Sequence, residues 1–239
     1  PDVTRLPRTE NLSDFVRDHP DLPPSLVFTC AAIEAGCALV NFTPSLALDV
    51  PTIAARAVAR GLPYCGRDGK TGETLLKSVL APMFLARNLR VLGWESHNLL
   101  GNRDGAVLDH EANRRSKLSG KSEVVEEILD YPLHHRVRID TMPSLDDWKT
   151  AWNLIHFEGF LGTRMSLQFT WQGCDSALAA PLVLDLVRLA EFAHRQGEAG
   201  PLRHTAAFFK STLGGAPAAF PDQMELLRAY ARSHATRDA

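Results

Sequence analysis

Two apolar stretches, Ala38-Leu-Val-Asn-Phe-Thr43 and Leu62-Pro-Tyr-Cys65, decide the fold class of this chain. Neither alternates between apolar and polar residues, which is typical of short strands buried on both faces of a sheet. Residues 51–60, between them, are predicted to form a helix with Pro51 in its first turn and a glycine just after its end. A helix over residues 25–36 precedes the first stretch. The order helix, strand, helix, strand predicts part of a parallel α/β sheet.

Further helices and strands follow along the chain. Hydrophobic periodicity predicts strands over residues 90–94, 136–140 and 165–171, and helices over residues 71–88, 122–129, 176–195 and 224–233. The stretch 148–152 is also predicted to be an apolar helix, with Asp146 and Asp147 placed to cap it. Together these elements predict an α/β protein with a second, mixed sheet covered by helices.

The composition predicts a globular protein with a hydrophobic core. Of 239 residues, 45% are hydrophobic and 23% are charged, and the formal net charge is −2. This balance lacks the strong positive field of a nucleic-acid-binding protein, and no apolar stretch reaches the about 18 residues of a membrane-spanning helix. We therefore expect neither a nucleic-acid nor a membrane partner. No metal site is predicted from the nine histidines, and the four cysteines are predicted to be reduced core residues: Cys30, Cys37, Cys65 and Cys174.

A glycine-rich loop follows the second short strand and opens a helix. It reads Gly66-Arg-Asp-Gly-Lys70-Thr71-Gly-Glu-Thr74. Backbone N–H groups at a helix start bind phosphate well, and a lysine and two threonine hydroxyls add further donors here. The segment therefore predicts a phosphate site, and a solvated turn with ordinary capping is the alternative.

Four lysines form the second candidate constellation. Lys117 and Lys121 are four residues apart, so on a helix they share a face, where they could lower one another's pKa or clamp a phosphate. The alternative for these two is a solvated surface. Lys149 lies between two tryptophans, and Lys210 follows the run Ala206-Ala-Phe-Phe209. Because lysine is costly to bury without a partner, these apolar surroundings favour a functional site.

Five segments resemble, in order, the myo-inositol-1-phosphate synthase family between about Ser25 and Lys210. They are Asn41-Phe-Thr-Pro-Ser45, Gly66-Arg-Asp-Gly-Lys-Thr-Gly-Glu-Thr74, Asn98-Leu-Leu-Gly-Asn-Arg-Asp-Gly105, Arg115-Ser-Lys-Leu-Ser-Gly-Lys-Ser122 and Cys174-Asp-Ser-Ala-Leu-Ala-Ala-Pro-Leu182. Lys149 and Lys210 also stand in the family's order. Each segment alone is a modest signal, and the order of all five makes the resemblance specific.

The resemblance implies an NAD-dependent isomerase that cyclises glucose 6-phosphate to myo-inositol phosphate by oxidation, enolisation, aldol closure and reduction. It also implies a cytoplasmic homotetramer that serves inositol and phospholipid biosynthesis. Arg67 and Gly69 stand where many members carry an acidic and a bulkier residue. Cyclisation of another sugar phosphate, such as fructose 6-phosphate, is therefore an alternative. A non-catalytic fragment that acts only in assembly with a full-length partner is the second alternative.

Positions of the family's site residues carry over onto this sequence. The resemblance implies four catalytic lysines that share proton transfer and stabilise an oxyanion: Lys117, Lys121, Lys149 and Lys210. It implies an NAD pocket lined by Phe42, Thr43, Asp68, Thr71, Asn102, Arg103, Asp104, Asp147, Asp175 and Ser176. Substrate binding is expected from Lys70, Thr71, Gly72, Thr74, Lys121 and Lys149.

The resemblance also divides the chain by role. Residues 1–93 are expected to be the latter part of a Rossmann-like NAD-binding domain, with a linker over 1–24 that includes a short helix around 12–17. Residues 94–189 are expected to form the catalytic and oligomerisation domain, and residues 190–239 to form helices that pack back on the NAD domain. The family's glycine-rich βαβ unit, which holds the diphosphate of NAD, has no counterpart in the sequence. We therefore expect residues upstream of Pro1 in the native protein.

Overall fold

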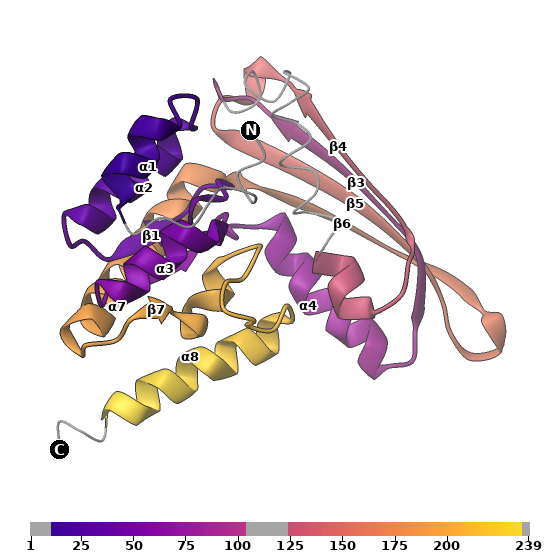
Figure 1. Cartoon of the computed structure of the whole chain (residues 1–239). Helices are drawn as coiled ribbons and strands as arrows, with labels where there is room; N and C mark the ends of the chain where they lie inside the picture. The colour runs from indigo at the N-terminus through magenta and orange to yellow at the C-terminus, as the bar shows by residue number, and fades with distance from the viewer. Residues whose placement is uncertain (1–10, 104–123, 236–239) are drawn as a thin grey trace. The chain divides into compact units, whose positions relative to one another are not determined.

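The computed structural model describes residues 11–103 and 124–235 (Figure 1). Their contacts divide the chain into two compact units. Unit 1 comprises the residues up to Gly69, the segment Leu182–Pro217 and the residues from Gln223 on. Unit 2 comprises Lys70–Pro181 and Ala218–Asp222. The expected division by role into residues 1–93, 94–189 and 190–239 stays a prediction.

Unit 1 is built on a small parallel sheet. Its strands lie in the order β1 (Leu39–Asn41), β2 (Pro63–Gly66), β7 (Gly200–Pro201), and both pairings are parallel. Helix α2 (Pro24–Glu34) precedes β1, and α3 (Pro51–Ala59) connects β1 to β2. A parallel connection needs such a crossover helix. The predicted α/β class and parallel sheet are confirmed.

Helix α1 (Leu12–Asp18) lies within the segment expected to be a linker. Asn11 caps it, since its side-chain oxygen accepts a hydrogen bond from the backbone N–H of Ser13 at 2.9 Å. Leu12 and Phe15 are buried and pack with residues of α2 and α3 in one hydrophobic cluster. The 3-10 helix η2 (Ala47–Asp49) joins the same cluster through Leu48. Helix α1 is thus part of the core of unit 1.

The C-terminal elements complete unit 1. Helix α7 (Asp175–Arg195) packs Leu186, Ala190 and Ala193 against β2. The 3-10 helix η5 (Arg203–Phe208) leads on toward α8 (Phe220–Ala235). Tyr230 of α8 donates a hydrogen bond to Glu198 at 2.6 Å and stacks on the ring of His204, with ring centroids 3.5 Å apart. These contacts attach α8 to the loop that follows α7.

Unit 2 is built on a mixed four-stranded sheet. The strands are β3 (Arg90–Leu100), β4 (His134–Thr141), β5 (Trp148–Glu158) and β6 (Arg164–Cys174), in the order β4-β3-β5-β6. The β3–β4 pairing is parallel, and the β3–β5 and β5–β6 pairings are antiparallel. Helix α4 (Glu73–Ala86) and a helical segment over 124–129 cover one face through a cluster that contains Phe84, Trp94 and Val125 (Figure 1). Two 3-10 helices, η3 (Pro143–Leu145) and η4 (Phe160–Gly162), lie in the connections.

A buried amide joins the two central strands of this sheet. The side-chain oxygen of Asn153 on β5 accepts hydrogen bonds from the indole of Trp94 at 2.9 Å and from the hydroxyl of Ser96 at 2.6 Å. All three residues are buried. The indole and the hydroxyl thus find an acceptor inside the core, as buried donors usually do, while Nδ2 of Asn153 has no hydrogen-bond partner among the described residues.

The prediction of a helix over residues 148–152 is wrong. These residues begin the strand β5, in which Ala151, Asn153 and Ile155 are buried, while the residues between them are more exposed. This is the two-residue period of a strand, and the tryptophans and threonine of the segment favour strands. Asp146 and Asp147 consequently do not cap the start of a helix here. The predicted strand 90–94 is also longer than expected, because β3 continues to Leu100.

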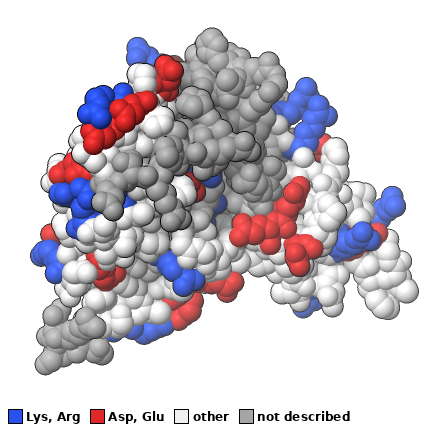
Figure 2. Space-filling model, in the orientation of Figure 1, with Lys and Arg blue, Asp and Glu red and all other residues white. Residues whose placement is uncertain are grey.

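The surface agrees with the small net charge. On the face shown in Figure 2, basic and acidic side chains of the described residues lie interspersed. No helix within residues 11–103 and 124–235 combines the length and the apolar character that crossing a membrane requires. Of the cysteines, Cys30 and Cys65 are buried as predicted, but Cys37 is exposed.

Candidate functional site

Helix α4 begins in the glycine-rich loop, as the phosphate-site prediction requires. Gly72 is its N-cap, and Glu73 and Thr74 form its first turn. The first N–H groups of a helix have no partners within the helix and carry its positive dipole end. Thr74 is only 2% exposed, and its hydroxyl has no hydrogen-bond partner among the described residues. The N–H groups and the hydroxyl at this helix start can therefore donate hydrogen bonds to the oxygens of an anion.

A lysine, an acid and a hydroxyl form a connected group beside this loop in unit 2. The Nζ of Lys149 lies 3.0 Å from one carboxylate oxygen of Asp175, and the hydroxyl of Thr71 donates to the other oxygen at 3.2 Å. The strand pairing explains this geometry. Lys149 on β5 pairs with Gly173 on β6, and α7 begins at Asp175 directly after β6. The structure thus brings together three of the predicted site residues.

A buried ion pair that the sequence reasoning missed lies next in α4. The Nζ of Lys77 is 3.2 Å from Glu73 and 3.1 Å from Nε2 of His135, and both charged side chains are almost completely buried. Burial lowers the pKa of the Lys77 amine, and the nearby charge of Lys149 lowers it further, while Glu73 raises it. A signal was present in the sequence, because Lys77 lies in the apolar run Leu75-Leu-Lys-Ser-Val-Leu80.

Lys70 is a second buried cation of unit 2. It is 3% exposed, and its Nζ lies 5.3 Å from the ring centroid of Phe220. Burial lowers the pKa of the Lys70 amine to about 7. The amine therefore changes charge near neutral pH, and its proposed role toward phosphate depends on pH.

Replacing Lys70 with Met is expected to stabilise the protein most at low pH. The pKa of Lys70 is about 7 in the folded state and about 10.4 in an unfolded chain, so between these values only the unfolded chain binds the proton. The cost of burying the charged Lys70 amine is therefore fully present below pH 7. Above pH 7 the free energy of unfolding of the wild type rises with pH. The gain of Lys70→Met over the wild type should shrink by roughly 1.4 kcal/mol per pH unit between about pH 7 and pH 9.

Urea unfolding at several pH values measures this difference. Arg90→Met provides the control, since Arg90 is 70% exposed on β3 and should give a difference that does not depend on pH. A constant gain for Lys70→Met across the same range would contradict the assignment.

A second pair of predicted residues meets in unit 1. The Nζ of Lys210 lies 2.8 Å from Asp68, and the backbone N–H of Lys210 donates to the carbonyl of Asp68 at 2.8 Å. The N–H groups of Asp68 and Gly69 donate to the carbonyls of Thr43 and Phe42 at 2.9 and 3.0 Å. A Cβ at Gly69 would overlap the ring of Phe42, so this close approach requires glycine. Three predicted residues thus lie in the loops after β1 and β2, and Lys210, which follows η5, joins them through Asp68.

The other predicted residues are distributed as follows. The side chain of Asn102 donates to Asp147 at 3.4 Å in unit 2. Ser176 lies exposed in the first turn of α7, and Arg103 is the last described residue before residue 104. Three predicted residues lie outside the described residues: Asp104, Lys117 and Lys121.

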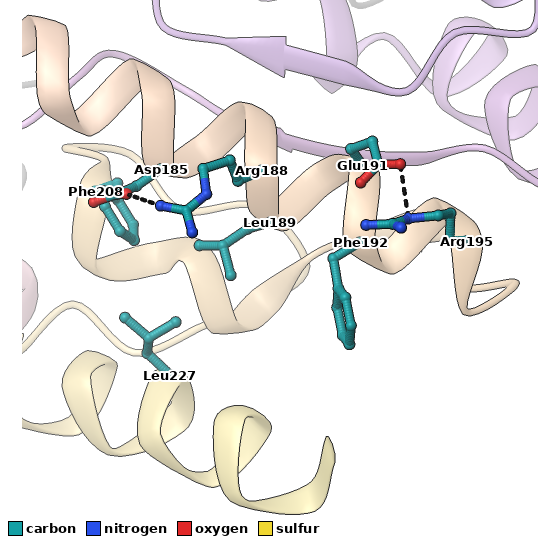
Figure 3. A pocket seen from close by; sticks show the side chains of 8 residues that line it. All are labelled: Asp185, Arg188, Leu189, Glu191, Phe192, Arg195, Phe208 and Leu227. Atoms are coloured by element: carbon teal, nitrogen blue, oxygen red, sulfur yellow. Dashed lines mark ion pairs between the residues drawn. The ribbon is translucent and has the colours of Figure 1, made fainter. Parts of the chain in front are cut away.

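A pocket of about 500 Å³ lies in unit 1, lined by α7, η5 and α8 (Figure 3). Its apolar lining is formed by Leu189, Phe192, Phe208 and Leu227. The two arginines at its rim are paired within α7: Arg188 with Asp185 at 3.6 Å and Arg195 with Glu191 at 2.7 Å. None of the predicted site residues lines this pocket.

Comparison with known proteins points to one family. The family described as Myo-inositol-1-phosphate synthase matches residues 72–176. Inositol-3-phosphate synthase 1 of Bacteroides thetaiotaomicron is 38% identical over 200 residues, which are 80% of this chain and 47% of that protein. Inositol-3-phosphate synthase of Saccharomyces cerevisiae is 32% identical over 218 residues, covering 84% of this chain and 40% of that protein. The chain belongs to the myo-inositol-1-phosphate synthase family.

Solved structures agree with this membership in the myo-inositol-1-phosphate synthase family. The crystal structure of inositol-3-phosphate synthase from Caenorhabditis elegans superposes with a TM-score of 0.84 at 27% identity, over 92% of this chain and 48% of that one. A myo-inositol-1-phosphate synthase-related protein from Thermotoga maritima has the same fold, with a TM-score of 0.81 at 24% identity. The chain spans about half the length, or less, of the curated synthases it matches.

Proposed function

We propose that this protein cyclises glucose 6-phosphate to myo-inositol phosphate with NAD as its cofactor. The observation that carries the proposal is the group of Lys149, Asp175 and Thr71 beside the N-terminus of α4, in a chain related to inositol-3-phosphate synthases. The proposal includes a cytoplasmic homotetramer that serves inositol and phospholipid biosynthesis. It also assigns residues 1–93 to cofactor binding and residues 94–189 to catalysis and assembly.

The substrate phosphate is assigned to the start of α4. The N–H groups after Gly72 and the buried hydroxyl of Thr74 supply neutral donors. Lys149 supplies a positive charge held in place by Asp175. Thr71, Lys70 and Lys121 complete the proposed set, on the strength of the family resemblance.

The loops after β1 and β2 fit part of NAD. In parallel sheets, nucleotides bind at the carboxyl ends of the strands, and Phe42, Thr43 and Asp68 lie there in unit 1. The carboxylate of Asp68 can accept a hydrogen bond from a hydroxyl of the cofactor. The proposed pocket also takes in Thr71, Asn102, Arg103, Asp104, Asp147, Asp175 and Ser176. When bound, NAD would take up a hydride from the substrate and return it.

The lysines would control the charge that develops on the substrate. Removal of a proton next to a ketone places negative charge on the ketone oxygen, and a fixed cation at that oxygen lowers the barrier. Lys149 and Lys210 are each held by one carboxylate, at 3.0 and 2.8 Å, so their ammonium groups keep a defined position. Together with Lys117 and Lys121, they are the proposed catalytic lysines, one of which accepts the proton.

A product assay tests this proposal. Purified protein with NAD should convert glucose 6-phosphate to an inositol phosphate that phosphorus NMR detects. Conversion of fructose 6-phosphate instead would support the alternative that the protein cyclises another sugar phosphate. Arg67 is the reason for this alternative, because many family members carry an acidic residue at its position. Folded protein that neither carries nucleotide nor turns over either sugar phosphate would overturn the proposal and favour a fragment that acts with a partner.

A further inference from the structure

The indole of Trp171 contributes a buried hydrogen-bond donor without an acceptor. Trp171 lies on β6, and its Nε1 has no hydrogen-bond partner among the described residues. The hydroxyl of Thr74 is also buried and also has no hydrogen-bond partner among the described residues. An indole N–H usually finds a partner when it is buried, because a buried polar group without one destabilises the fold. Both groups lie at the N-terminus of α4, where a ligand that supplies acceptors would satisfy them together.

Close contact with Gly72 places this indole at the start of α4. A Cβ built on Gly72 would overlap Nε1, Cδ1 and Cε2 of Trp171, so the nitrogen-bearing edge of the ring lies directly against the helix N-cap. Thr74 follows two residues later in the first turn of the same helix. The indole N–H thus lies at the start of the helix whose first turn also carries the buried threonine hydroxyl.

The strand register puts Lys149 on the same side of the sheet. Trp171 pairs with Ala151, and Lys149 pairs with Gly173, two residues further along β6. Directly opposed residues project to the same face, so Lys149 is a diagonal neighbour of Trp171. The cation and the indole N–H therefore face the start of α4 from the same face of the sheet.

We propose that Trp171 is a substrate-binding residue whose indole N–H donates a hydrogen bond to the substrate phosphate. This inference rests on the proposed function and extends it. The donors come from two different elements, β6 and α4, and an anion with several terminal oxygens can accept from both. A phosphate monoester provides that arrangement, whereas the two oxygens of a carboxylate lie in one plane.

The indole N–H signals of the wild-type protein test the inference directly. Adding inorganic phosphate, and then glucose 6-phosphate, should shift the indole proton of Trp171 downfield. Trp94 provides an internal reference, because its indole already donates to Asn153 and should not move. Single Trp→Phe variants assign the signals, and the wild-type titration does not depend on how well any variant folds.

Affinity measurements add a second readout. Trp171→Phe keeps an aromatic ring but removes the donor, so it should weaken the binding of inorganic phosphate about tenfold or more, the effect of one hydrogen bond to a charged group. Trp148→Phe is the matched control, because Trp148 is 56% exposed on β5 of the same unit, and it should bind as the wild type does.

The outcomes separate this inference from the proposed function. If phosphate binds the wild type but leaves the Trp171 signal in place, and Trp171→Phe binds equally well, the role of Trp171 is wrong and the cyclase proposal stands. If neither phosphate nor glucose 6-phosphate binds the wild type, both proposals are wrong.

Discussion

Replacing Lys149 with Met should lower kcat for the cyclisation of glucose 6-phosphate by roughly 10²- to 10⁴-fold. Met keeps most of the length of the side chain and removes the charge. The carboxylate of Asp175 would then keep the hydrogen bond from the hydroxyl of Thr71 but lose its ion pair with Lys149. KM should rise as well, because Lys149 is proposed to help hold the phosphate. Steady-state kinetics with glucose 6-phosphate measures both constants.

Two variants make this result specific. Arg90→Met removes an exposed cation from β3 of the same unit and should leave kcat unchanged. Lys149→Arg keeps the positive charge and should recover part of the lost rate, limited by the different shape of the guanidinium group. Lys149→Met with the turnover of the wild type would refute the catalytic assignment of Lys149.

Replacing Lys77 with Met should destabilise the protein by about 3–5 kcal/mol, the usual cost of removing one partner of a buried ion pair. The reason is that Glu73, which is 1% exposed, would keep its charge without the ammonium group at 3.2 Å. Because Glu73 also belongs to the first turn of α4, weaker phosphate binding should accompany the loss. Urea unfolding measures the free energy of unfolding. The double variant Glu73→Gln with Lys77→Met should recover much of the stability that Lys77→Met loses.

The chain offers a matched control for this ion pair. Glu191 and Arg195 have the same spacing of four residues on a helix, but their side chains are 55% and 68% exposed. Arg195→Met should change the free energy of unfolding by less than about 1 kcal/mol, as exposed pairs usually do. Equal effects of Lys77→Met and Arg195→Met would show that the burial of Lys77 adds nothing to the stability of the fold.

Local patterns predicted much of the fold. The short apolar strands and the prolines and glycines around α3 predicted the parallel sheet, since these signals act within a few residues. The segment after residue 148 was misassigned, because a run of aromatic and apolar residues fits a helix or a strand equally well over so few positions. Its place between β3 and β6 is what fixes the strand.

The candidate site was predictable by residue type but not by pairing. Lysines in apolar surroundings marked Lys149 and Lys210. Their acids, Asp175 and Asp68, are 26 and 142 residues away in the chain, so only the folded chain joins them. Lys77 was missed because a lysine in a helix usually reaches solvent. Trp171 was not among the predicted site residues, since no sequence pattern shows that a buried indole N–H lacks an acceptor.

The amide of Asn153 has a consequence for how activity can vary within this fold. A slip of β5 by two residues would move Lys149 by about 7 Å, the length of two residues in a strand, and separate it from Asp175. Asn153 opposes such a slip, because Trp94 and Ser96 reach its oxygen only in the observed alignment. Substitutions of this amide should therefore weaken the contact between Lys149 and Asp175 through strand alignment, while every side chain proposed to bind substrate stays unchanged.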